Sequence, residues 1–139
     1  MAKFRQLSTQ LWMDDKFLSL SIDARLLFVW MFTHPESGSS GLFTLNRNVC
    51  ETQTGIKNID KTIKELEDIE RVRCDYKHHL IWVVNQFKHA SKSPKIVIGV
   101  FFEIQRLPVS FLIDEFVSKY ELEFIPYNVS NQTEARKAQ

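Results

Sequence analysis

A chain of 139 residues can form one domain with a buried core, and 44% hydrophobic and 25% charged residues are ordinary proportions for a globular protein. No apolar run approaches the roughly 20 residues of a membrane span, and the N-terminus lacks the apolar segment of a signal peptide, so we expect a cytoplasmic protein without a membrane partner. The formal net charge of +1 excludes a strongly basic protein and does not by itself indicate a nucleic-acid partner.

The N-terminal part of the chain predicts an arm followed by a buried helix. Residues 3–12 place single apolar side chains between polar ones, which favours an extended arm or an edge strand over a helix. Ser21 is a good N-cap for a helix that is apolar nearly all round and ends at His34-Pro35. Residues 36–41 contain two glycines and three serines, which indicates a flexible loop.

The middle of the chain predicts a strand and two helices. Residues 42–45 form a short strand, and Asn46 is the N-cap of a short helix that stops at Gly55. Asn58 caps a longer helix. Its apolar positions follow steps of four, three and three residues, so one face packs and the other is free: Ile59, Ile63, Leu66 and Ile69.

A hairpin and two more helices follow. Residues 71–76 and 80–84 are rich in strand-forming residues on either side of a polar turn. Ser93-Pro94 supplies an N-cap and a proline at the first position of a helix that runs to about Leu107. Proline then breaks this helix, and residues 110–120 form an amphipathic one.

The order helix, strand, helix, helix and hairpin is that of a winged helix. We therefore predict an α+β, mostly α fold: a helix-turn-helix with a β-hairpin wing, plus two C-terminal helices. Residues 1–87 would be the winged-helix DNA-binding domain with its arm, residues 88–127 a helical extension and residues 128–139 a disordered tail. Such folds most often present the third helix to the DNA major groove and the hairpin to the adjacent backbone or minor groove.

The third helix carries the first set of candidate DNA-binding residues. Lys57, Lys61 and Lys64 are spaced to form one stripe opposite the apolar face, where ammonium groups can neutralise phosphates. Asn58 and Thr62 are candidates for contacts to base edges. The alternative is a solvated helix face, and four acidic residues in the second half of the helix support it. They predict that only the N-terminal half approaches DNA.

The hairpin and the segment after it carry the second set. Four residues around the hairpin tip are candidates for contacts to phosphate or the minor groove: Arg73, Lys77, His78 and His79. Residues 88–95 contain no acid and add Lys88 and Lys92 as phosphate contacts. The alternatives are a hairpin tip that is charged only because it is exposed, and a soluble linker.

Charge is distributed unevenly along the chain, and no catalytic or metal-binding motif stands out. Residues 57–95 contain nine Lys or Arg against six acids, whereas residues 111–124 contain four acids and one base, so the middle is basic and the C-terminal part acidic. Cys50, Cys74 and the histidines lack regular ligand spacing, so we expect no metal site and no disulfide. We find no Gly-rich phosphate loop, HExxH or GxSxG motif, and expect neither an enzyme nor a cofactor.

Several segments of the chain resemble phage replication initiator proteins and the related DnaD-like primosomal winged-helix domains. They are residues 4–21 (FRQLSTQLWMDDKFLSLS), 24–28 (ARLLF), 33–35 (THP), 40–42 (SGL), 93–95 (SPK) and 112–116 (LIDEF). The resemblance implies origin binding or recruitment of a helicase loader during phage or mobile-element replication. Many relatives carry an additional C-terminal loader-binding or ATPase module, so we expect that this polypeptide does not load a helicase alone.

The sequence thus predicts a winged-helix DNA-binding protein of a phage or mobile element that acts in replication initiation. Its expected partners are double-stranded DNA and a helicase loader or another replisome protein. The apolar helix after Ser93-Pro94 also leads us to expect a homodimer. Two alternatives stay open: a transcriptional repressor with the same DNA-binding surface, and an interaction module that binds a replisome or host-defence protein without DNA.

Overall fold

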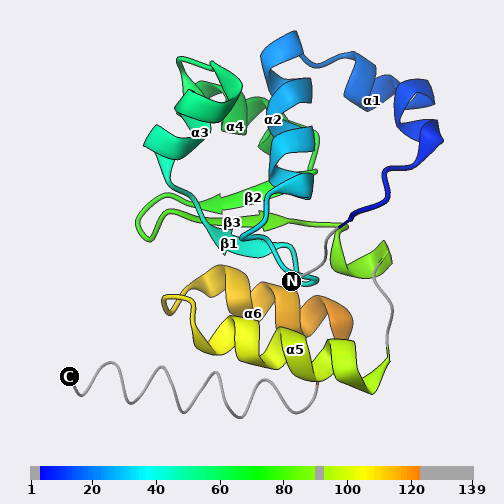
Figure 1. Ribbon diagram of the computed structural model, residues 1–139, viewed down its shortest axis with the longest axis vertical. Helices are drawn as coiled ribbons and strands as arrows, with labels where there is room; N and C mark the ends of the chain where they lie inside the picture. Colours follow the sequence, from blue (N-terminus) through cyan, green and yellow to red (C-terminus); the bar gives the residue numbers. More distant parts are fainter. Residues whose placement is uncertain (1–3, 90–92, 123–139) are drawn as a thin grey trace.

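The computed structural model describes residues 4–89 and 93–122 and has an α+β, mostly helical fold with a small antiparallel sheet (Figure 1). Its elements are, in chain order, η1 (Thr9–Met13), α1 (Asp15–Leu18), α2 (Ile22–Thr33), β1 (Leu42–Thr44), α3 (Arg47–Thr54), α4 (Ile59–Asp68), β2 (Val72–Asp75), β3 (Leu80–Val83), η2 (Phe87–His89), α5 (Pro94–Gln105) and α6 (Phe111–Tyr120). The predicted disordered tail lies outside the described residues, as does Lys92.

Capping side chains set the helix starts where the sequence predicts them. Helices α2 to α6 begin directly after Ser21, Asn46, Asn58, Ser93 and Ser110, and each of these side chains accepts a hydrogen bond from a backbone N–H of the first turn. Gly55, with φ 79°, ends α3 in the left-handed conformation. These predictions are confirmed.

The N-terminal arm is only partly extended. Residues 4–8 have no regular secondary structure, but η1 makes the prediction of an arm or edge strand wrong for the second half of residues 3–12. Ser8 accepts a hydrogen bond from the Gln10 backbone and caps this 3₁₀ helix. The Asp14 carboxylate caps α1 and also forms an ion pair with Arg71, which ties the arm to the sheet.

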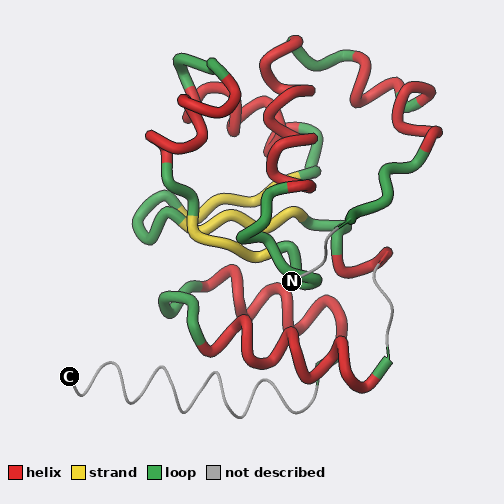
Figure 2. Tube along the Cα trace, in the orientation of Figure 1, coloured by secondary structure: helices red, strands yellow, loops and turns green. Residues whose placement is uncertain are grey.

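The sheet lies between two helical layers. Its strand order is β1-β3-β2, with β3 paired antiparallel to both neighbours. Helices α2, α3 and α4 lie on one side and helices α5 and α6 on the other, as Figure 2 shows with the strands in yellow. All four residues of β3 are buried, because this central strand is covered on both faces.

Each face of the sheet has its own hydrophobic core, because strand side chains alternate between the faces. On the α2–α4 side, Ile81 and Val83 pack with a cluster that includes Leu27, Ile63 and Leu66. On the α5–α6 side, the cluster includes Leu42, Leu80, Trp82, Val100, Ile104 and Phe116. The predicted boundary between residues 87 and 88 thus separates two layers that share one sheet.

Residues 36–41, predicted as a flexible loop, make contacts with distant parts of the chain. Ser37 and Ser40 are fully buried. The Gly38 carbonyl accepts a hydrogen bond of 2.5 Å from Gln86 Nε2, and the Arg5 guanidinium donates to the carbonyls of Ser37 and Gly38. Contacts that are distant in sequence fix this loop, and local composition does not reveal them.

Within the described ranges, no helix combines the length and the apolar character that a membrane crossing requires. The longest helices, α2 and α5, have 12 residues each.

Candidate nucleic-acid interface

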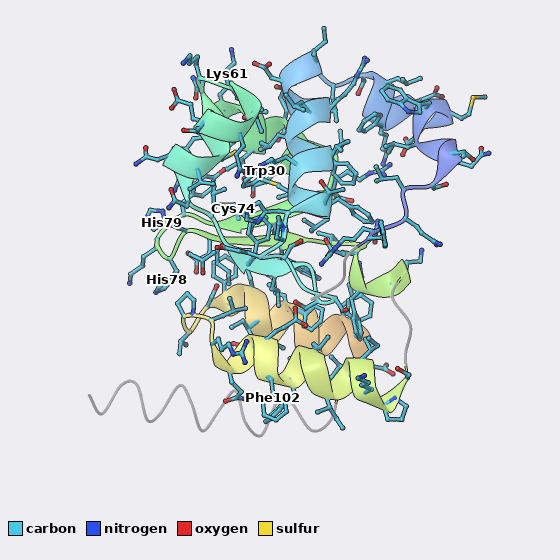
Figure 3. The ribbon with its side chains drawn as sticks, viewed as in Figure 1. Trp30, Lys61, Cys74, His78, His79 and Phe102 are labelled. Carbon is cyan, nitrogen blue, oxygen red and sulfur yellow. The ribbon has the colours of Figure 1, made fainter. Side chains whose placement is uncertain are left out.

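Helix α4 presents an apolar face to the core and a charged face outward. Ile63 and Leu66 are fully buried beneath α2 and the sheet, whereas Lys61 and Lys64 are exposed on the opposite side. Figure 3 places Lys61 on the outer side of the helical layer, away from the sheet. The predicted division of this helix into a packed and a free face is confirmed.

Most acids of α4 are bound within the fold, which the sequence does not reveal. Asp60 forms an ion pair of 2.8 Å with Arg47 of α3. Glu65 accepts hydrogen bonds from the backbone N–H and the hydroxyl of Ser21. Glu67 accepts a hydrogen bond of 2.5 Å from the Tyr76 hydroxyl. The ion pair compensates the charge of Asp60, whereas Glu65 and Glu67, two of the four acids that favoured a merely solvated face, keep their charge and are oriented by hydrogen bonds.

The residues that precede α4 have local partners. Lys57 lies in the turn before the helix, and its ammonium group is 3.2 Å from the Glu51 carboxylate. The Lys57 side chain is 84% exposed, so this surface pair contributes little to stability. The Asn58 side chain accepts from the Lys61 backbone N–H as the N-cap. Its oxygen therefore has a structural task, although the residue itself is exposed.

Thr62 does not belong to the exposed surface, and its prediction as a base contact is wrong. The residue is only 4% exposed, and its hydroxyl donates a hydrogen bond of 2.8 Å to the Asn58 carbonyl. Position 62 lies three residues after Ile59 and four before Leu66, so it shares the edge of the buried face.

The turn of the β2–β3 hairpin is linked to the helices through an arginine that the sequence did not single out. Arg47 donates a hydrogen bond of 2.6 Å to His79 Nδ1 and pairs with Asp60, so one guanidinium joins α3, α4 and the turn. His79 has a positive φ of 55°, which this contact helps to hold. The only signal in the sequence is that Arg47 directly follows the N-cap Asn46.

The base of the same turn is fixed to α6 through Asp75. This buried carboxylate accepts hydrogen bonds from the Ser110 hydroxyl at 2.7 Å and from His78 Nδ1 at 2.8 Å. Burial alone would raise the pKa of Asp75, but these hydrogen bonds outweigh it and lower the pKa below its usual range. Ser110 and His78 both donate to the carboxylate, so the imidazole does not activate the serine.

Arg73 is not at the hairpin tip, and the prediction that groups it with Lys77, His78 and His79 is wrong. It lies on the sheet face that α6 covers, and its guanidinium is 2.9 Å from the Glu115 carboxylate. Its strand neighbours Val72 and Cys74 point to the other core, so Arg73 must point away from α4. Lys77, in contrast, is exposed in the turn itself.

Lys88 is exposed in η2, beyond the end of β3 that is farthest from the hairpin turn. The structure therefore brings together the exposed groups of α4, the turn after β2 and the start of α3, and it leaves Lys88 apart from them.

The two thiols are buried in the α2–α4 core. Burial raises the pKa of Cys50, and it raises the pKa of Cys74 to about 12, so both thiols are neutral near pH 7. In the part of the chain that the structure describes, no three His, Cys, Asp or Glu side chains are grouped so that they can hold a metal ion.

A cavity of about 730 Å³ lies between the N-terminal arm and α2. Phe28 and Phe32 of α2 form part of its wall, and the ion pair of Asp14 with Arg71 forms another part. None of the predicted DNA-binding residues is among its described lining residues.

Comparison of the chain with protein-family models, with curated proteins and with solved structures found no match in any of the three. The likeness of residues 4 to about 127 to replication initiators therefore stays a prediction.

Proposed function

We propose that this chain is a winged-helix protein of the cytoplasm that binds duplex DNA, with α4 in the major groove and the turn after β2 on the sugar–phosphate backbone. The observation that carries the proposal is the outer face of α4. There Lys61 and Lys64 are exposed, the neighbouring Asp60 is paired with Arg47, and Glu65 and Glu67 are oriented by hydrogen bonds from Ser21 and Tyr76. The element order α2-β1-α3-α4-β2-β3 and the strand order β1-β3-β2 support it.

The dimensions of α4 suit the task. A helix of 10 residues is about 15 Å long, and the major groove, about 12 Å wide, admits a helix. Lys61 and Lys64 would neutralise phosphates, which contributes affinity without reading sequence. Lys77 would contact the backbone beside the groove, since the Arg47 contact with His79 holds its turn near α3 and α4.

For the biological role we propose replication initiation in a phage or mobile element, which rests on the resemblance in sequence. A transcriptional repressor would use the same surface. Sequencing the DNA that the protein binds in cells separates the two roles, because a replication initiator would occupy an origin and a repressor a promoter. We propose no enzymatic activity.

Duplex binding as a function of salt tests the proposal. Binding that depends on phosphate contacts weakens linearly with salt on a log-log plot, by a slope of about 0.9 for each contact. We expect Lys61→Ala/Lys64→Ala to weaken binding and to reduce this slope by about two, with no change in melting temperature. Lys16→Ala/Arg106→Ala removes the same charge from exposed basic residues outside α4 and is the matched control. An α4 variant with wild-type affinity and slope would remove α4 from the interface.

A further inference from the structure

We propose that the exposed face of α5 binds a helix of a partner protein whose apolar stripe is flanked by acidic side chains. We call this face the α5 stripe; it consists of Lys95, Ile98, Gly99, Phe102 and Arg106. Apart from the adjacent pair Ile98 and Gly99, successive positions are three or four residues apart, so they lie along one side of the helix. The proposal concerns a surface distinct from α4 and does not depend on DNA binding.

The α5 stripe is apolar in its middle and has no cover among the described residues. Val100 and Ile104 on the opposite side of α5 are fully buried against α6 and the sheet. Ile98 and Phe102 are 54% and 55% exposed. Figure 3 shows Phe102 on the outer side of the α5–α6 layer, pointing away from the sheet. Two large apolar side chains on one exposed helical face are typical of a contact surface.

Gly99 lies beside Phe102 on the same face and packs against none of the residues that the structure describes. A Cβ atom built at this position meets no atom within 4 Å, and φ is not positive. A glycine inside a helix costs roughly 1 kcal/mol relative to alanine, so an alanine here would stabilise the isolated chain. The glycine instead leaves the helix backbone without a side chain beside Phe102. Small residues of this kind let the backbone of a second helix approach closely.

The ends of the stripe define the charge of the partner. Lys95 and Arg106 are exposed at its two ends, and the stripe contains no acid. Pairing with a second copy would set Lys95 against Arg106 in an antiparallel arrangement and Lys95 against Lys95 in a parallel one. Both arrangements place like charges opposite each other, whereas a partner helix with acidic flanks places acids opposite the basic residues at both ends of the stripe. The charges therefore favour a different protein over the homodimer that the apolar helix alone suggests.

The position of the stripe allows a partner and DNA to be bound together. The sheet separates α5 from α4, and Lys61 and Phe102 lie on opposite outer sides of the molecule (Figure 3). A partner held on α5 would thus be brought to the DNA that α4 is proposed to bind.

Selection from a display library of randomised helical peptides tests the proposal without knowledge of the partner. Peptides are selected on the wild-type chain and then measured against variants by fluorescence anisotropy. We expect selected peptides to carry an apolar i, i+3/i+4, i+7 pattern with Asp or Glu on its flanks. We expect Phe102→Asp and Gly99→Leu each to weaken the binding of these peptides at least tenfold. Both sites are exposed, and Gly99→Leu also improves helix propensity, so melting should show folded proteins.

A charge exchange gives the decisive comparison. Lys95→Glu/Arg106→Glu should weaken the binding of the acidic peptides at least tenfold. It should strengthen the binding of peptide versions that carry Lys in place of the acids. Lys16→Glu/Lys88→Glu changes the net charge equally away from the stripe and should leave both affinities nearly unchanged. Peptides that lack acids, or that bind Phe102→Asp as well as wild type, would overturn the proposal.

Two further results would also overturn the proposal by identifying another occupant. One is a wild-type dimer in sedimentation that becomes a monomer in Phe102→Asp, which would assign the stripe to a second copy. The other is binding to anionic lipid vesicles that Phe102→Asp abolishes, which would assign it to a membrane surface. Neither result bears on the salt dependence of duplex binding, so failure of this proposal and failure of the DNA proposal remain distinguishable.

Discussion

Gly41 and Gly99 illustrate how differently two glycines constrain the same chain. Gly41 has φ +82°, and a Cβ there would lie 2.7 Å from the Val83 carbonyl oxygen and 2.9 Å from Gln86 Cβ. Both the left-handed backbone conformation and the lack of room for a Cβ atom therefore require glycine just before β1. Gly99 has neither requirement.

We predict that Gly41→Ala lowers the free energy of unfolding by roughly 2 to 4 kcal/mol, through left-handed strain and overpacking against the backbone. Gly99→Ala is the matched control and should raise it by roughly 0.5 to 1 kcal/mol. Urea denaturation of both variants measures the difference. Equal effects would show that the loop before β1 does not hold Gly41 in this conformation.

Glu103 of α5 is a half-buried carboxyl beside the loop of residues 36–41. Burial raises its pKa, and the hydrogen bonds from Ser40 and the charge of Arg5 offset only part of this effect. A carboxyl whose pKa is raised on folding favours the folded state most at low pH. This contribution decreases as the pH rises from the ordinary value near 4.5 through the higher folded value.

We predict that Glu103→Gln raises the melting temperature at pH 7, because the amide keeps an acceptor for the Ser40 hydroxyl without a buried charge. The gain should shrink as the pH falls towards 4.5. Asp114→Asn, at an exposed position of α6, is the control and should leave the melting temperature unchanged both at pH 7 and near pH 4.5. A variant that is less stable than wild type at pH 7 would show that the attraction of the Glu103 carboxylate to the charge of Arg5 outweighs the cost of its burial.

At the scale of elements, the sequence predicts what local chemistry decides. The four N-caps Ser21, Asn46, Asn58 and Ser93 and the C-cap Gly55 each act on backbone groups within a few residues, so their positions could be inferred without the fold. Two failures, at Thr62 and in η1, involve local hydrogen bonds, and the others involve distant partners. Arg73 turns to Glu115 of α6, and residues 36–41 are held by Arg5 and Gln86. Three of the four acids of α4 contact residues that are distant in sequence: Arg47, Ser21 and Tyr76. Only packing creates these contacts.

The hairpin turn carries the element-scale prediction. Replacing Lys77, His78 and His79 with Ser or Gly should reduce duplex affinity about equally for all sequences, because the turn is expected to contact the backbone. His78→Ser alone removes the hydrogen bond to Asp75 but keeps the exposed Lys77. This variant therefore separates the effect of a less well held turn from the effect of losing the charge of Lys77. Preferred and random duplexes are compared at one salt concentration. If only binding to the preferred duplex weakened, the turn would read bases instead.

For the whole molecule, the two helical layers depend on one sheet. Without α5 and α6, the side chains of Leu42, Leu80 and Trp82 would lose their cover. Exposing each such side chain costs roughly 1.5 to 3 kcal/mol, and domains are stable by only about 5 to 15 kcal/mol. We therefore predict that a chain of residues 1–89 is unfolded or aggregated in circular dichroism and sedimentation. A folded monomer with wild-type duplex binding would show that the first 89 residues are an independent domain.

Because all four residues of β3 are buried and its side chains serve two cores, neither core can lose this strand without affecting the other. Unfolding should then be a single transition that involves both layers. A ligand that binds only the folded chain stabilises it by mass action, wherever its site lies. Duplex bound at α4 would therefore protect α5 and α6 from proteolysis, and a partner bound at α5 would likewise protect α4, even if neither ligand changed the shape of the other's site.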